Sequence, residues 1–163
     1  MGTKVKAIFL DFDGPIIPLR AQMKGGGINK KADPFCIKCL NRITNTTGSE
    51  IVVSSTWRMY GLPKVRSLLK DWGATGNVIG ITPELESKMD SGIWQPSPRG
   101  LEIAEFIKNW NILHPQDEIK NFVIFDDDRD MDYLMPFLIH TPYETGITRQ
   151  DADLAIKRLG EMG

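Results

Sequence analysis

Short apolar runs alternate along the chain with segments in which apolar residues recur every three or four positions. Uninterrupted runs of Val, Ile, Leu and Phe are typical of parallel strands buried on both faces. The other segments have the period of amphipathic helices. The alternation predicts an α/β, Rossmann-like three-layer sandwich with a central, mostly parallel sheet of about five strands. These strands are expected at residues 5–10, 51–53, 77–81, 122–125 and 137–140.

The helices between these strands are marked by their ends as well as by their periodicity. Asp33 and Pro34 are residue types of an N-cap and a first helical position, and Gly48 is typical of a C-terminal residue in the left-handed conformation. Thr148 is expected to cap the last helix. The predicted helices begin near residues 34, 63, 99 and 149. The polar, Pro-rich stretch 82–98 predicts no regular element.

Composition narrows the class of protein. With 163 residues the chain is expected to form a single domain, residues 1–163. Twenty basic and 21 acidic side chains leave a net charge of −1, which argues against binding of nucleic acid or membrane through bulk charge. The apolar runs are too short for a secretory signal or a membrane span, so a cytoplasmic protein with no membrane partner is expected. The oligomeric state stays open.

The two cysteines, Cys36 and Cys39, form one C-x-x-C motif inside a predicted amphipathic helix. Such a motif is shared by zinc half-sites and redox pairs. The sequence has no second C-x-x-C. His114 and His140 are far from the cysteines in sequence and do not have the spacing of zinc ligands. Two small core residues are therefore the expected interpretation.

Polar side chains follow three of the predicted strands at the point where each strand ends. Ligands of open parallel sheets bind beyond the carboxyl ends of the strands, so these side chains are candidates for chemistry. Carboxylates that converge there repel one another unless a cation lies between them, and Mg²⁺ prefers such oxygen ligands. A solvated acidic loop after the fourth strand is the alternative. The candidates are Asp11, Asp13, Ser54, Ser55, Asp126 and Asp127.

The spacing of the first two acids predicts a specific reaction. A carboxylate can attack phosphorus to form an aspartyl-phosphate that water later hydrolyses. This reaction needs a neighbouring group that protonates the leaving oxygen and then takes a proton from water. Asp13, two residues beyond Asp11, is placed for this role.

Together these motifs resemble those of the haloacid dehalogenase-like (HAD) phosphatases, over residues 5–132. The resemblance is carried by Asp11-Phe12-Asp13-Gly14 after an apolar strand, a strand-end Ser54, a basic residue that opens a later helix, and Asp126-Asp127. The stretches 53–58 and 124–128, with Arg99 followed by Glu102-Ile103, are similar to the HAD branch associated with RNA-repair systems.

The resemblance implies a hydrolase, a magnesium-dependent phosphatase that forms an aspartyl-phosphate. Asp11 would be the nucleophile and a metal ligand, and Asp13 the general acid and base, with its main-chain carbonyl on the metal. Ser54 would bind the transferring phosphoryl group; ending a strand or capping a helix is its structural alternative. Asp126 and Asp127 would hold Mg²⁺. Which of Asp128, Asp130 and Asp132 assists stays open.

A cation must neutralise charge on the phosphoryl group in the transition state. Arg99, at the start of a predicted helix, is the preferred candidate over Lys88, with an exposed surface arginine as the alternative. Ser55 and Arg58 are expected to bind substrate, Arg58 as a bidentate clamp; a structural ion pair is the alternative for Arg58. Pro15 departs from the Thr or Val usual after the Gly of the first motif, which puts efficiency in doubt.

The site is expected to be open. The stretch between Asp13 and Ser54 holds a loop and one helix, which leaves little or no room for a cap domain. An open site resembles relatives that act on large or extended substrates, such as nucleic-acid ends or phosphoproteins, so a small metabolite is less favoured. Of these classes, a nucleotide or a nucleic-acid end is the expected phosphorylated substrate. Trp57, Trp94 and the loop 24–31 are candidate contacts, although core packing and plain flexibility are their default interpretations.

Two rival functions remain at the level of sequence. A metal-dependent nuclease of the PIN type also gathers acids at the end of a parallel sheet, but it does not need Asp13 or Ser54. A catalytically silent module that binds phosphorylated ligands is the other rival, because Pro15 is unusual. A receiver domain is disfavoured, since no Lys follows the last strand.

Overall fold

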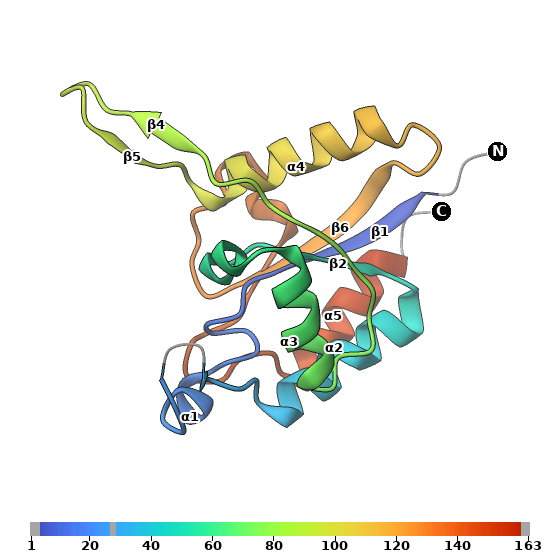
Figure 1. The fold of residues 1–163 in the computed structure, drawn as a ribbon. Coiled ribbons are helices and arrows are strands. Elements are labelled where there is room, and N and C mark those ends of the chain that lie inside the picture. Colours follow the sequence, from blue (N-terminus) through green and yellow to red (C-terminus); the bar gives the residue numbers. More distant parts are fainter. Residues whose placement is uncertain (1–3, 27–28, 161–163) are drawn as a thin grey trace.

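The fold is a five-stranded parallel sheet between two helical layers, in a computed structural model that describes residues 4–26 and 29–160 (Figure 1). The strand order is β3-β2-β1-β6-β7, and every neighbouring pair is parallel. This confirms the predicted fold class. The strands of this sheet are β1 (Val5–Leu10), β2 (Glu50–Val53), β3 (Val78–Ile81), β6 (Ile119–Asp126) and β7 (Leu138–His140).

Helices cover both faces of the sheet. One face packs against α2, α3 and α5, and the other against α4 and the short 3-10 helix η3 (Figure 1). The α-helices are α1 (Leu19–Gln22), α2 (Pro34–Thr47), α3 (Leu62–Asp71), α4 (Arg99–Leu113) and α5 (Arg149–Gly160). Two 3-10 helices, η2 (Thr56–Tyr60) and η3 (Asp132–Phe137), follow the ends of β2 and β6.

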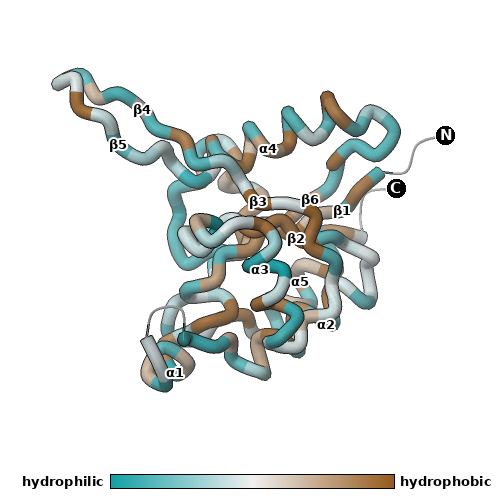
Figure 2. The backbone as a smooth tube through the Cα atoms, in the orientation of Figure 1, coloured by the Kyte–Doolittle hydropathy of each residue, from teal (hydrophilic) through white to brown (hydrophobic). Residues whose placement is uncertain are grey.

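The central strand shows why the apolar runs are continuous. Ile8 and Leu10 of β1 pack into the core under α2, α3 and α5, whereas Ala7 and Phe9 pack into the core under α4. Successive strand residues point to opposite faces, so a strand buried on both sides needs apolar residues at every position. Figure 2 shows the hydrophobic stretches gathered in the central strands.

The helix ends form as their residue types predict. The Asp33 carboxylate caps α2 by accepting hydrogen bonds from the backbone N–H groups of Phe35 and Cys36, and Gly48 ends the helix with φ +70°. Thr148 and Asp151 bond reciprocally at the start of α5, which is the geometry of a capping box. Cys36 and Cys39 are buried free thiols of α2, which confirms the core interpretation.

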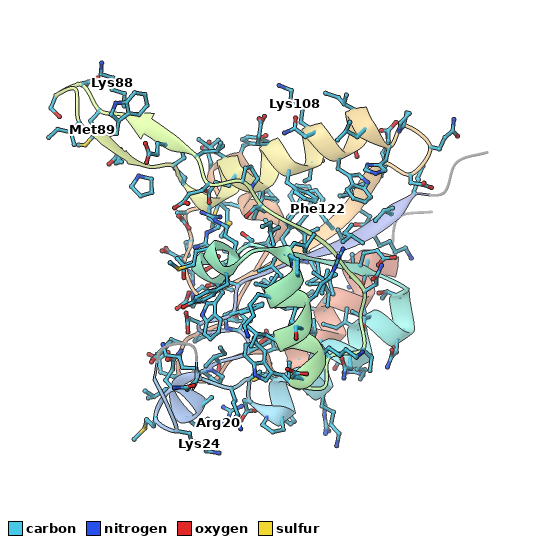
Figure 3. The ribbon with its side chains drawn as sticks, in the orientation of Figure 1. Arg20, Lys24, Lys88, Met89, Lys108 and Phe122 are labelled. Carbon is cyan, nitrogen blue, oxygen red and sulfur yellow. The ribbon has the colours of Figure 1, made fainter. Side chains whose placement is uncertain are left out.

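The stretch 82–98 forms a hairpin where no regular element was predicted. Strands β4 (Glu86–Lys88) and β5 (Trp94–Pro96) pair antiparallel and project away from the body of the molecule (Figure 1). Lys88 and Met89 lie at its far end (Figure 3), and Trp94 on β5 is exposed. Each strand has only three residues, too few for a detectable alternation of apolar and polar positions. The hairpin is an insertion between β3 and α4 that is much smaller than a cap domain.

No helix in the described part of the chain combines the length and the apolar composition needed to cross a bilayer. Residues 27 and 28 of the predicted loop 24–31 lie outside the described residues.

Candidate active site

The ends of three neighbouring strands bring the predicted acids and serine together. Asp11 follows β1, Ser54 follows β2, and Asp126 is the last residue of β6. In the register of the sheet Leu10 pairs with both Val53 and Phe125, so the residue after each of these positions lies at the same level. The backbone continues this pairing, because the Asp11 N–H donates to the Phe125 carbonyl and the Ser54 N–H to the Leu10 carbonyl.

Three carboxylates at this edge form an acidic cluster of Asp11, Asp126 and Asp127. Each offers an oxygen within 4.8 Å of those of the other two. Burial, then the charges of Asp126 and Asp127, hold the pKa of Asp11 well above its usual range, although Arg99 opposes this. Burial likewise raises the pKa of Asp126 to about 7. A cation bound among the three carboxylates would offset their mutual repulsion when they are ionised, and their oxygen atoms are ligands that fit Mg²⁺.

Arg99 is the cation that contacts the acidic cluster. Its Nη1 lies 3.6 Å from Asp11 Oδ1 and 3.5 Å from Asp126 Oδ2, and it also donates to the Ser54 carbonyl. Lys88, the competing candidate, is on the projecting hairpin (Figure 3). Arg99 is therefore placed where a phosphoryl group bound to Asp11 would meet it, and it is a part-buried residue rather than an exposed surface arginine.

Asp130 builds the helix terminus that carries Arg99. Pro98 at the N-cap of α4 makes no side-chain hydrogen bond to the helix, and Asp130 caps the helix instead. The Asp130 carboxylate accepts from the Arg99 N–H, and the Asp130 carbonyl accepts from the Gly100 N–H, both at 3.0 Å. The chains approach so closely that a Cβ on Gly100 would lie 1.9 Å from the Met131 carbonyl oxygen. Among the acids that follow Asp127, Asp130 thus serves the helix rather than the acidic cluster.

Glu102 links Arg99 to Arg58 and to Leu85, the residue directly before β4 of the hairpin. Glu102 is 2% exposed, and its carboxylate accepts two hydrogen bonds of 2.9 Å from the Arg58 guanidinium. It also accepts from the Leu85 N–H at 2.9 Å, and it lies 3.8 Å from Arg99 Nε. Arg58, the predicted clamp, is thus held in a structural ion pair, and its Nη1 also donates to Thr82 Oγ1.

Two hydrogen-bond donors and one cation surround the carboxylate of Asp13. Gln22 Nε2 donates to Oδ1 at 2.7 Å, Trp57 Nε1 donates to Oδ2 at 2.9 Å, and Lys30 Nζ lies 3.6 Å from Oδ1. Trp57 is 5% exposed and packs against the ring of Phe12, so the predicted core role is confirmed. Its indole N–H nevertheless reaches the site.

The turn after Asp11 explains Gly14 and accommodates Pro15. Gly14 has φ +108°, and a Cβ there would lie 2.8 Å from Cβ of Asp127. This position needs glycine for its conformation and for the close approach of the acidic cluster. Pro15 is buried, and its carbonyl accepts from the Ile147 N–H at 2.8 Å. Its fixed φ fits a turn that is closed by the Ile16 and Ile17 N–H groups, both of which donate to the Phe12 carbonyl.

The two serines after β2 differ in their surroundings. Ser55 Oγ accepts from the Trp57 N–H and so caps η2, and its hydroxyl also lowers the pKa of Asp11 slightly against the effect of burial. Ser54 Oγ is buried, at 1% exposure of the residue, and has no hydrogen-bond partner among the described residues. Buried hydroxyls are normally paired, so an unpaired one at this edge fits a ligand oxygen that completes it.

This edge of the sheet holds all six residues predicted from the strand ends and the helix start: Asp11, Asp13, Ser54, Arg99, Asp126 and Asp127. Their partners Glu102, Gln22 and Lys30 were not predicted. For Glu102 a signal existed, because a carboxylate three residues after Arg99 lies on the same helix face. Gln22 and Lys30 reach Asp13 only through the tertiary fold.

Comparison with known proteins agrees with this geometry. No curated protein matches the chain at a significant level. The family model described as the HAD domain in Swiss Army Knife RNA repair proteins matches residues 7–152, which include every residue of the acidic cluster as well as Ser54 and Arg99. The chain belongs to this family of HAD domains.

Proposed function

We propose that this HAD-type hydrolase is a magnesium-dependent phosphatase that forms an aspartyl-phosphate on Asp11. The proposal is carried by one observation: Asp11 shares one sheet edge with two carboxylates, a guanidinium and the Ser54 hydroxyl, which has no partner among the described residues. A carboxylate nucleophile needs its own charge neutralised as it approaches an anionic phosphoryl group. Arg99 supplies part of that neutralisation, and a cation held by Asp11, Asp126 and Asp127 would supply the rest.

The first half of the reaction uses Asp11 and Asp13. A carboxylate oxygen of Asp11 attacks phosphorus, the bond from phosphorus to the leaving oxygen breaks, and the protonated Asp13 donates its proton to that oxygen. Arg99 and the Ser54 hydroxyl bind phosphoryl oxygens as charge develops on them. Asp11, Asp126 and Asp127 would hold Mg²⁺, which would supply further neutralisation of that charge.

The second half returns the enzyme to its starting state. Asp13, now a carboxylate, takes a proton from water while the water oxygen attacks phosphorus. The bond between phosphorus and Asp11 breaks, inorganic phosphate leaves, and Asp13 is again protonated. Gln22, Trp57 and Lys30 orient Asp13 for both proton transfers.

For the substrate we propose a nucleotide or the terminal phosphate of a nucleic acid. Two observations support this class. The described insertion between β3 and α4 is a narrow hairpin, which leaves the edge of the sheet accessible to a large substrate. The family to which the chain belongs is described as a domain of RNA repair proteins.

The deciding experiment is release of phosphate from a panel that contains an aryl phosphate, mononucleotides and 3′- or 5′-phosphorylated oligonucleotides, with MgCl₂ or with EDTA. We expect release only with Mg²⁺, and oligonucleotides of unchanged length on a denaturing gel. Shortened oligonucleotides would instead establish a nuclease. Absence of turnover on every substrate, with Mg²⁺ bound, would establish a silent binding module.

Ser54→Ala is expected to separate catalysis from stability. Loss of one phosphoryl-binding donor is expected to lower kcat by about 100-fold. The free energy of unfolding should stay within about 1 kcal/mol or rise, because the substitution removes a buried hydroxyl that has no partner in the part of the chain that the structure describes. Phosphate release and urea denaturation measure the two effects, with the exposed Ser67→Ala in α3 as the matched control. A strongly destabilised Ser54→Ala protein with normal turnover would assign the hydroxyl to the fold.

Mg²⁺ is expected to raise the melting temperature more at pH 8 than at pH 5.5. The pKa of Asp126 is raised to about 7 in the folded state from a usual value of 3.8, so ionising it costs stability as the pH rises between these values. At pH 8 that cost is fully present and a bound cation relieves it, whereas at pH 5.5 the cation must first displace the proton. At 100 times Kd the gain is about 2.7 kcal/mol, which corresponds to roughly 5–10 °C.

Differential scanning calorimetry with MgCl₂ and with KCl of equal ionic strength measures this shift. The Asp126→Asn protein should lose most of it, while Asp71→Asn, an exposed carboxylate on α3, should keep it. An equal rise in melting temperature at both pH values would contradict the assignment of the acidic cluster as the metal site.

A further inference from the structure

A cavity of about 460 Å³ is lined by the end of β3, by the residues that follow it and by the C-terminal half of α4. Ile81, Thr82 and Pro83 form one wall, α4 residues form the opposite wall, and Arg58 lies at one end. Cavities of this size that are mostly apolar with a few polar groups are typical of small-molecule sites. The mechanism proposed above uses none of its walls directly.

Arg58 connects this cavity to the active site. The Arg58 guanidinium bonds to Thr82 Oγ1 on the cavity side and to Glu102, which lies 3.8 Å from Arg99. Arg99 in turn contacts Asp11. Strand β3 is two strands away from β1, or about 10 Å at the usual spacing of strands. The cavity is therefore close to the active site, and Arg58 both lines the cavity and bonds to the Glu102 carboxylate beside Arg99.

The α4 wall is built from stacked rings. Trp110 stacks against Phe106 with centroids 6.0 Å apart, and His114 stacks against Trp110 at 3.8 Å. Gly80 lets this wall approach the sheet, since a Cβ there would lie 2.7 Å from the Phe106 ring. Asn109 adds an amide at the rim, where its only hydrogen bond among the described residues is a long one of 3.3 Å to Glu105.

This lining matches the chemistry of a nucleobase. A base has flat apolar faces, which aliphatic and aromatic walls accommodate, and an edge that mixes donors with acceptors. An Asn amide presents one donor group beside one acceptor, which is the pattern that pairs with a base edge. A sugar phosphate offers no such flat face, and a helix of a partner protein is too wide for a cavity of this volume.

We propose that this cavity binds a nucleobase of a substrate whose terminal phosphate lies at Asp11. This inference rests on the proposed function and narrows the substrate to phosphorylated oligonucleotides. Asn109 is ten residues beyond Arg99, about 15 Å along the helix. That separation is longer than the span of one nucleotide from its phosphate to its base. The cavity therefore holds the base next to the phosphorylated nucleotide, so a dinucleotide is the smallest substrate that fills it.

The test compares two phenylalanine substitutions on neighbouring residues of α4. Asn109→Phe replaces the amide at the rim of the cavity with a larger ring that narrows it, whereas Lys108 projects away from the body of the molecule (Figure 3), so Lys108→Phe adds the same ring outside the cavity. Each protein is assayed with an aryl phosphate, a mononucleotide and a dinucleotide phosphorylated at the same end. Melting temperatures confirm that both variants are folded.

We expect the unsubstituted protein and Lys108→Phe to hydrolyse the dinucleotide with a kcat/KM at least 10-fold above that for the mononucleotide. Asn109→Phe should lose this advantage, through KM, and keep its activity on aryl phosphate. An unchanged preference in Asn109→Phe, or no preference in the unsubstituted protein, would overturn the inference while phosphatase activity stands.

Binding without turnover separates this inference from the proposed function. Calorimetric titration of a phosphorylated dinucleotide into the Asp11→Asn protein is expected to show binding that Asn109→Phe weakens at least 10-fold and Lys108→Phe does not. If no protein hydrolyses any phosphate, the proposed function fails, and this titration still decides whether the cavity takes a base. Equal affinities in the two Phe variants would show that it does not.

Discussion

Asp11→Asn is expected to abolish phosphate release, with kcat at least about 10⁴-fold lower, because an amide cannot attack phosphorus. The same substitution is expected to stabilise the protein at pH 8 without Mg²⁺. Burial and two neighbouring carboxylates raise the pKa of Asp11, so its ionisation at pH 8 costs folding free energy that a neutral side chain does not. Steady-state kinetics and thermal denaturation measure the two effects on one preparation.

A matched control for this result is Asp71→Asn, which removes an exposed carboxylate from α3. It should change neither kcat nor the melting temperature at pH 8. Trapping supplies a further readout, since acid quenching of the unsubstituted protein with radiolabelled substrate should leave phosphate on the chain and the Asn variant should carry none. Turnover above one tenth of the original in Asp11→Asn would place the nucleophile elsewhere.

Glu102→Ala is expected to have the largest effect on stability. The substitution leaves the Arg58 side chain, 11% exposed, without its bidentate partner, and it leaves the Leu85 N–H without an acceptor. Breaking a buried ion pair by removing one partner costs about 3–5 kcal/mol, because a buried charge stays uncompensated. Urea denaturation should show this loss in the free energy of unfolding. Glu102→Gln should lose less, since its amide oxygen still accepts hydrogen bonds.

A double-mutant cycle isolates the cause. Arg58→Leu combined with Glu102→Ala should be more stable than the two single effects added together predict, because the second substitution removes the orphaned charge. The exposed pair Arg42 and Asp153 is the comparison, and its cycle should show a coupling of less than about 1 kcal/mol. Additive losses at Glu102 and Arg58 would mean that the two charges do not depend on each other.

The parallel sheet was predictable because its signals are local. The run 7–10 is apolar at every position, and both its faces are buried; the caps at Asp33, Gly48 and Thr148 act within their own helices. The hairpin was not predictable in this way. Its strands have three residues each, and among the described strands they pair with each other alone. Nothing in the spacing of apolar residues over 82–98 distinguishes this pairing from an irregular loop.

The site was predictable to the extent that strand ends determine it. Asp11, Ser54 and Asp126 follow from the rule that parallel strands deliver their last residues to one edge. The partners that orient them depend on close approaches between distant segments. Asp130 caps α4 only because Gly100 leaves room for the backbone at Met131, and no periodicity encodes that contact. The bidentate partner of Arg58 likewise required the fold, because 44 residues separate it from Glu102.

The position of β1 in the middle of the sheet has a consequence for local opening. The three strands that carry Asp11, Ser54 and Asp126 each have a hydrogen-bonded strand on both sides, whereas β3 and β7 are the edges. Edge strands detach at a lower free energy than central ones, so amide hydrogen exchange should be slowest in the strands that hold the reacting groups. Fraying at either edge therefore disturbs Thr82 or His140 first and leaves the acidic cluster and its serine assembled.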